Sequence, residues 1–165
     1  MTTTTSSVTT TSTTPRLSIP KVAPALYKAQ LALDAAVRDS GIDAGMHELI
    51  KIRASQINGC AFCLDMHTQD ARAIGETDQR MHLLAAWRDT DLYDEREQAA
   101  LALTEAITVI SANHVPDAVW DAAAAVFEPA ELAAIVMAVI SINGWNRIAI
   151  SSGSKGGEYR LGQHG

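Results

Sequence analysis

Apolar residues recur every three or four positions along most of the chain, which is the spacing of one face of an α-helix. In residues 23–40, Leu26, Leu33 and Val37 fall on one stripe, and the pattern stops at Gly41. Glycine is a common residue just beyond the end of a helix. This segment therefore predicts an amphipathic helix whose apolar stripe faces a core.

The next periodic segment, residues 46–57, directs Leu49 and Ile52 to one side. It breaks at Asn58 and Gly59, a pair suited to the left-handed conformation in which many helices end. A second helix is therefore predicted, followed by a tight turn.

Five further segments have the same helical periodicity and short connections between them. Asp94 with Glu97 three residues later matches a capping box, and Pro116 and Pro129 stand where a first helical turn tolerates proline. These helices are predicted at residues 60–74, 79–87, 96–112, 117–127 and 130–150. Since no strand-like alternation is present, the chain is predicted to be all-α, a compact bundle of six or seven helices.

The two ends of the chain differ from this middle. Residues 1–15 are a Thr/Ser-rich stretch with too little apolar surface to order itself, so a disordered tail is predicted. The helical domain is expected at residues 16–152, followed by a flexible, Gly- and Ser-rich tail at 153–165. Because the last predicted helix is apolar on nearly every face, more than a small bundle can bury, a homo-oligomer is expected, a trimer or hexamer.

Composition narrows the class of protein. Apolar residues make up 47% of the 165 residues and aromatic residues only 5%, an Ala-rich mixture that favours helix. The net charge of −6 argues against nucleic acid as a partner. No signal peptide is evident, and the most apolar stretch, Leu132 to Ile142, is shorter than the roughly 20 residues that span a bilayer. A cytoplasmic protein without a membrane partner is therefore predicted.

The only two cysteines, Cys60 and Cys63, stand at C-x2-C spacing, and His67 follows one helical turn later. On a helix that begins at Cys60, these three side chains share one stripe. If the helices on either side of Gly59 fold back antiparallel, Glu48 comes within about one helical turn of His67. The carboxylate would then reach the histidine directly or through one water molecule.

This grouping suits thiol chemistry. A thiol with a pKa near ~8.5 is a poor nucleophile at neutral pH, and a paired imidazole corrects this. A carboxylate orients the imidazole, and a second cysteine converts a sulfenic acid into a disulfide. Position alone leaves open which sulfur attacks, because Cys60 has the helix N-terminus and Cys63 has the imidazole; the larger effect of a paired histidine favours Cys63.

Other interpretations of the same residues are weaker. In one interpretation, the two cysteines are small buried apolar residues with a purely structural role. Cys60, Cys63, His67 and Glu48 have the ligand types of a zinc site, but three ligands on one helical stripe crowd a tetrahedron. A c-type haem site needs histidine where Leu64 stands, and a thioredoxin-like motif needs a βαβ pattern.

The spacing Glu-x11-Cys-x2-Cys-x3-His, together with "INGWNR" at residues 142–147, resembles the AhpD-like alkylhydroperoxidases of the carboxymuconolactone decarboxylase family. The resemblance covers roughly residues 16–152. It implies an oligomeric all-α fold in which Cys63 attacks a peroxide, Cys60 resolves it, and His67 with Glu48 forms a proton relay. Some members carry a histidine where this chain has Phe62, which implies a weaker relay or a more apolar pocket.

The predicted function is therefore a thiol-dependent peroxidase that takes a hydroperoxide as substrate and a dithiol or protein as electron donor, with no metal and no cofactor. A redox-sensing or interaction module that uses the same disulfide is one alternative. A decarboxylase or lactone-processing enzyme is the other, although such family members lack the cysteine pair. His47 is expected at the surface or capped, and Asp65 and Asp70 on a solvated helix face. Asn143 and Asn146 are expected in structural hydrogen bonds inside an assembly.

Overall fold

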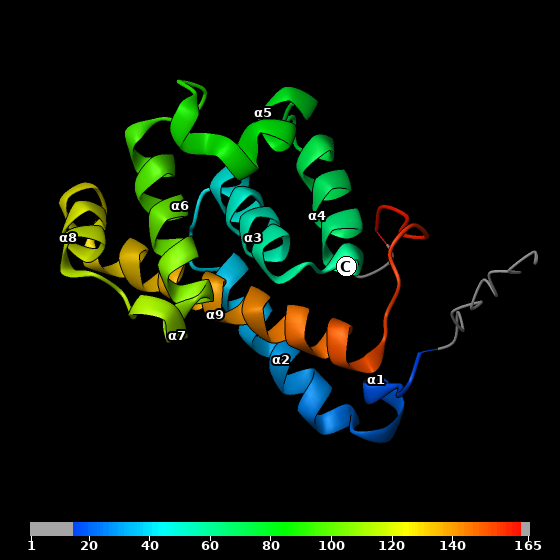
Figure 1. Ribbon diagram of the computed structural model, residues 1–165. Coiled ribbons are helices and arrows are strands. Elements are labelled where there is room, and N and C mark those ends of the chain that lie inside the picture. Colours follow the sequence, from blue (N-terminus) through cyan, green and yellow to red (C-terminus); the bar gives the residue numbers. More distant parts are fainter. Residues whose placement is uncertain (1–14, 163–165) are drawn as a thin grey trace, which may run out of the picture.

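The computed structural model describes residues 15–162. Within that range the chain forms helices and no strands, so the predicted all-α class is confirmed. The helices, shown in Figure 1, are α1 (Ile19–Val22), α2 (Pro24–Arg38), α3 (Ala44–Asn58), α4 (Ala61–Ala73), α5 (Asp78–Leu83), the 3₁₀ helix η1 (Leu84–Asp89), α6 (Glu95–Thr108), α7 (Ile110–Asn113), α8 (Asp117–Val126) and α9 (Pro129–Ser152). The predicted disordered tail at residues 1–15 lies almost entirely outside the described residues.

The predicted segments correspond to α2, α3, α4, α5 with η1, α6, α8 and α9. The segment at residues 96–112 was predicted as one helix and instead breaks at Val109, whose φ of −107° and ψ of 37° are not helical. Three β-branched residues in succession, Thr108, Val109 and Ile110, lower the helix propensity at this point. The short α7 follows the break.

The predicted helix ends depend on local contacts, and the structure contains them. Asp94 and Glu97 form both hydrogen bonds of a capping box at the start of α6. Gly59 has a φ of 68°, the left-handed conformation in which α3 ends. Pro129 is the first residue of α9, whereas Pro116 lies one position before α8.

The core is organised around α9, which packs against α2, α3, α4, α6 and α8. One hydrophobic cluster joins α3, α6, α8 and α9 and includes Ile50, Leu103 and Ile135. A second joins α3 to the α5–η1 region and includes Leu49, Ile52 and Trp87. Since α3 contributes to both clusters, it is held on two sides and makes a rigid support for residues that project from it.

The length and composition of α9 are those of a membrane-crossing helix, with a mean hydropathy of 1.5 over its most apolar window, but half of that window is buried inside this fold. It therefore has the packing of a core helix. Met137, Ile140 and Ile150 remain 38–45% exposed, as the all-round apolar pattern led us to expect. Leu26 was predicted to face the core and is instead 74% exposed, because no residue within 15–162 covers the first turns of α2 on that side.

The C-terminal segment after α9 runs back along α4, as Figure 1 shows. Tyr159 is buried, whereas Leu161 is 59% exposed. Gly156 lies so close to the first turn of α4 that a Cβ atom there would be 2.5 Å from the carbonyl oxygen of Ala61. We call residues 154–160 the C-terminal strap. The described part of the predicted flexible tail is thus in contact with the fold, next to the cysteine pair.

Candidate active site

The turn between α3 and α4 places the two cysteines at the start of α4. Cys60 was predicted as the first residue of that helix and is instead its N-cap, because Gly59 turns the chain and leaves Cys60 in an extended conformation. The Cys60 sulfur accepts a hydrogen bond from the backbone N–H of Cys63, at 3.3 Å. This sulfur therefore takes the capping position usually filled by Ser, Thr, Asp or Asn.

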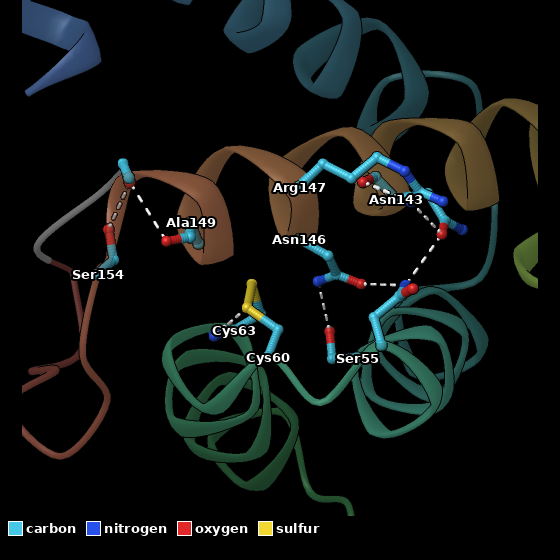
Figure 2. Close-up of a disulfide and its surroundings, with 10 residues drawn as sticks. Ser55, Cys60, Cys63, Asn143, Asn146, Arg147, Ala149 and Ser154 are labelled. Atoms are coloured by element: carbon cyan, nitrogen blue, oxygen red, sulfur yellow. Dashed lines mark hydrogen bonds between the residues drawn. A yellow bond between two sulfur atoms is a disulfide. The ribbon is translucent and has the colours of Figure 1, made fainter. Parts of the chain in front are cut away.

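Cys60 and Cys63 are joined in a disulfide, with their Cα atoms 5.4 Å apart (Figure 2). Both are 1% exposed. The pair packs with Ile142 and Ala149 of α9, while Phe62 and Trp145 cover it from the side. The sulfur atoms therefore lie in an apolar environment, at the contact between α4 and α9.

His67 lies one turn further along α4 and meets Glu48 of α3. Its Nδ1 atom is 3.2 Å from Oε2 of Glu48, and the Lys51 ammonium lies 2.5 Å from the other oxygen, Oε1. Burial alone would raise the pKa of Glu48, but the contact with His67 and the charge of Lys51 outweigh it and hold that pKa below its usual value. Glu48 is therefore ionised beside the imidazole at neutral pH.

Nδ1 of His67 and Oε2 of Glu48 are close but not aligned for a hydrogen bond. In the part of the chain that the structure describes, they are the only buried side-chain nitrogen or oxygen atoms without a hydrogen-bond partner. A buried polar atom without a partner costs roughly 1–3 kcal/mol, so such atoms are rare outside sites where they have a use.

A cavity of about 280 Å³ opens beside the cysteine pair, between α1, α2, α4 and α9. Cys63 and His67 line it, whereas Cys60 and Glu48 do not. Most of its wall is apolar and is formed by Tyr27, Leu31, Phe62, Met66, Trp145 and Ile148. The rings of Tyr27 and Trp145 meet edge to face, with centroids 5.2 Å apart, which fixes one side of the wall.

Phe62 occupies the position at which some similar sequences have a histidine, and in this chain it contributes to the cavity wall. The resemblance implied a weaker relay or a more apolar pocket. The geometry supports the second, because the ring adds apolar surface directly beside Cys63.

Asp70 is the third polar side chain near the imidazole. Its Oδ2 atom is 3.9 Å from Nδ1 of His67, at the edge of ion-pair range. The ligand atoms of Glu48, His67 and Asp70 lie within 4.8 Å of one another, close enough to share a metal ion. The ammonium of Lys51 opposes a cation there, so we interpret the group as a proton-handling one. We call Glu48, Lys51, His67 and Asp70 the charged cluster.

The expectation for His47 was wrong, and the partly exposed Asp65 and Asp70 have hydrogen-bond partners that were not expected. His47 was expected at the surface but is 6% exposed, and burial, together with the charge of Lys51, lowers its pKa to about 4. Asp65 and Asp70 were expected on a solvated face. Asp65 instead accepts hydrogen bonds from the backbone N–H groups of Gly157 and Tyr159, and Asp70 accepts one from the Tyr159 hydroxyl. Their partners are about ninety residues away in the sequence, so no local pattern indicated them.

A second polar group lies about two turns further along α3, near its C-terminal end, where it meets α9. Asn58 donates to the side-chain oxygens of Asn143 and Asn146, and Asn146 donates to Ser55. Figure 2 shows Asn146 extending from α9 toward Ser55, next to the disulfide. We call Ser55, Asn58, Asn143 and Asn146 the amide cluster. The predicted structural hydrogen bonding of Asn143 and Asn146 thus occurs within the single chain.

The sequence of this chain is similar to those of known proteins. Residues 24–106 match the model of the carboxymuconolactone decarboxylase family. The uncharacterized protein YdfG of Bacillus subtilis is 42% identical over 140 residues, which cover 85% of this chain and 95% of that protein.

Two solved structures add to this. A protein of unknown function from Agrobacterium tumefaciens, ATU0492, described as a candidate antioxidant defence protein AhpD, superposes with a TM-score of 0.84 and 38% identity; the match covers 88% of this chain and 99% of that one. The debrominase Bmp8 has the same fold, with a TM-score of 0.74 and 20% identity over 82% of this chain and 73% of its own.

Proposed function

Since this chain belongs to the carboxymuconolactone decarboxylase family and has the fold of its AhpD-like members, we propose that it is a thiol-dependent peroxidase. In this proposal Cys63 attacks a hydroperoxide, Cys60 resolves the product, and His67 with Glu48 relays protons. The substrate is an organic hydroperoxide, and the electrons come from a dithiol or a protein donor.

The reaction begins from the reduced pair. His67 takes the proton of the Cys63 thiol, and Glu48 stabilises the resulting imidazolium. The thiolate attacks the terminal oxygen of the hydroperoxide and breaks the O–O bond; the alkoxide leaves with a proton from the relay as an alcohol, and Cys63 becomes a sulfenic acid. The Cys60 sulfur then attacks that sulfenic acid, releasing water and forming the disulfide. The donor restores both thiols with two electrons and two protons.

One observation carries this proposal: Cys63 and His67 line the same apolar cavity, while Cys60 stands behind Cys63 and away from the cavity. A hydroperoxide in the cavity would meet only one of the two sulfurs. Because the two cysteines are three residues apart, with their Cα atoms 5.4 Å apart, the Cys60 sulfur can complete the disulfide without a large movement of the backbone.

Counting free thiols tests the proposal. One equivalent of an organic hydroperoxide, added to the reduced protein, should convert two thiols into one disulfide and yield one equivalent of the alcohol. Unchanged thiols after prolonged incubation would contradict the peroxidase assignment.

Two alternatives predict different results. A redox-sensing or interaction module would oxidise once and would not turn over repeatedly when a dithiol reductant is supplied. A decarboxylase or lactone-processing enzyme would keep its activity after both cysteines are replaced. Multiple turnover that depends on both cysteines supports the peroxidase over either of them.

We further propose that the protein is a soluble, cytoplasmic homo-oligomer. The exposed apolar residues Met137 and Ile140 on α9, and Leu26 on α2, support the oligomer, because exposed apolar surface on a soluble protein often marks an interface. Light scattering at micromolar concentration should give a multiple of the 17.6 kDa chain mass, three- or sixfold. A monomer at that concentration would contradict the oligomer.

A further inference from the structure

We propose that Tyr159 of the C-terminal strap is a positioning residue for the relay: it holds Asp70 so that a second carboxylate stands beside His67. The inference rests on the proposed peroxidase function and adds Asp70 and Tyr159 to its site. Neither residue belongs to the motif Glu-x11-Cys-x2-Cys-x3-His, and both are assigned to the site from their contacts in the structure.

The geometry begins at the Asp70 carboxylate, whose two oxygens have different partners. Oδ1 accepts a hydrogen bond of 2.7 Å from the Tyr159 hydroxyl. Oδ2 is 3.9 Å from Nδ1 of His67. A hydrogen bond to one oxygen fixes the rotation of the carboxylate, and in this rotation the other oxygen faces the imidazole.

The phenol is suited to this task. Burial and the neighbouring Asp70 carboxylate raise the pKa of Tyr159 to about 12, so the hydroxyl stays protonated and remains a donor over the working pH range. The tyrosine residue is buried, with 8% of its surface exposed.

The strap itself is attached to α4 independently of that hydroxyl. Asp65 accepts hydrogen bonds of 2.6 Å from the N–H of Gly157 and 3.1 Å from the N–H of Tyr159. These bonds hold the pKa of Asp65 below its usual value, so the carboxylate stays ionised as their acceptor. The attachment fixes the tyrosine backbone one helical turn from Asp70, since Asp65 and Asp70 are on the same helix. Removing only the hydroxyl should therefore leave the strap in place.

The electrostatic effect follows from the charges around the imidazole. When His67 takes the thiol proton it becomes positive, and an anion within about 4–6 Å favours that charged form. The groups that face this site are Glu48, Lys51 and His47 of α3, Asp34 of α2, Cys63 and Asp70 of α4, and Tyr159 of the strap. His47 is uncharged at neutral pH and Lys51 offsets part of the charge of Glu48. The Asp70 carboxylate, 3.9 Å from Nδ1 of His67, therefore adds negative charge that favours the thiolate–imidazolium pair.

The test uses the full chain with Cys60→Ser, in which Cys63 cannot form the internal disulfide. Thiolate formation at Cys63 is followed by its ultraviolet absorbance as a function of pH, with no peroxide present. Asp70→Asn should raise the midpoint of thiolate formation by about one pH unit, and Tyr159→Phe should raise it by roughly half as much, because the carboxylate is then free to rotate. The rate of the first reaction with an organic hydroperoxide should show the same upward shift.

Tyr93→Phe is the matched control. The Tyr93 hydroxyl is also buried and donates to a carbonyl, that of Arg80, but it packs with Trp87, away from the cysteines. This substitution should leave the midpoint unchanged while removing one tyrosine hydroxyl hydrogen bond. Circular dichroism checks that each variant is folded.

A double variant tests whether Tyr159 acts through Asp70. Tyr159→Phe should add no further shift when Asp70 is already Asn, because the two substitutions then remove the same interaction. An unchanged midpoint in Tyr159→Phe, a downward shift, or an equal shift in the absence of Asp70 would each overturn the positioning role. Failure of the proposed peroxidase function would give a different result: the midpoint of thiolate formation would shift as expected, but no peroxide would be reduced.

Discussion

The charged cluster, where α3 meets α4, and the amide cluster, where α3 meets α9, flank the same pair of cysteines from two sides. In the amide cluster the hydrogen bonds are complete: Asn58 donates to two amide oxygens, and Asn146 both accepts and donates. In the charged cluster Nδ1 of His67 and Oε2 of Glu48 are buried without a hydrogen bond. His67 also opens onto a cavity.

The difference separates two uses of buried polar groups. A satisfied amide network fixes how two helices pack and has little capacity to respond to protons. An incompletely satisfied set of ionisable groups costs folding free energy but can take up and release protons. We therefore expect changes in the charged cluster to alter rates and pH dependence, and changes in the amide cluster to alter stability.

The largest expected effect is on the cysteines themselves. Cys63→Ser should abolish peroxide consumption, because this sulfur is the one beside His67 and the cavity. Cys60→Ser should still permit one stoichiometric reaction and leave a sulfenic acid on Cys63 that a dimedone-type reagent traps, detected by mass spectrometry. The reverse pattern, with a trappable Cys60, would reverse the assigned roles.

The next effect concerns the relay. His67→Ala and Glu48→Gln should each slow the first step by about 10²-fold, the scale of a general acid–base contribution. The pH at which the step is half-maximal should also rise, since the thiolate loses its stabiliser. Stopped-flow measurements across pH give both quantities, with the exposed His82→Ala as control. A relay variant whose rate and pH profile match wild type would remove His67 and Glu48 from the mechanism.

For the amide cluster, Asn146→Ala should lower the free energy of unfolding by about 2 kcal/mol, because one of the two Asn58 amide hydrogen bonds and the hydrogen bond to the Ser55 hydroxyl are lost. The first-step rate should change by less than a few-fold. Urea denaturation and stopped-flow kinetics measure the two effects, and Asn113→Ala, at an exposed position on α7, is the control. A slow but stable variant would contradict the separation of the two clusters.

The last expected effect, similar in size to that of Asn146→Ala, is a pH dependence of stability that arises from the buried His47 of α3. The pKa of His47 is lowered from 6.5 to about 4 in the folded state, so between these values the unfolded chain binds a proton that the folded chain does not. Stability is therefore full above pH 6.5 and falls as the pH decreases toward 4.

Between pH 7 and pH 5 the loss from His47 should be about 2 kcal/mol. His47→Gln should remove that part of the loss, measured by urea denaturation at both pH values, whereas His82→Gln should not. Equal pH dependence in wild type and His47→Gln would show that His47 is not the group responsible.

The sequence predicted those parts of the fold and site that depend on near neighbours. Asn58 and Gly59 marked the end of α3, Asp94 and Glu97 marked the start of α6, and the helical spacing of Cys60, Cys63 and His67 placed three side chains along one region of α4. The approach of Glu48 to His67 followed from folding two helices back across Gly59, because helix dimensions alone fix that distance. Such features are set within one or two turns of helix.

Contacts between segments that are far apart in the sequence could not be predicted from these local patterns. Asp65 and Asp70 have the pattern of a solvated helix face, and the strap, returning from beyond α9, gives them partners from outside α4. His47 lies on a helix that buries residues on several faces, so its burial depends on neighbours that periodicity does not identify. The break at Val109 arises because local β-branching outweighed an otherwise regular pattern.

The hairpin of α3 and α4 has a further consequence for how such a protein can change over generations. Every side chain proposed to handle protons or electrons, from Glu48 to Asp70, belongs to this one contiguous hairpin. Much of the wall of the cavity beside them belongs to α2 and α9, including Tyr27, Leu31, Trp145 and Ile148. Mutations in α2 and α9 can therefore change which molecule the cavity binds while the α3–α4 hairpin stays the same. Substrate selectivity and reaction chemistry can thus evolve separately.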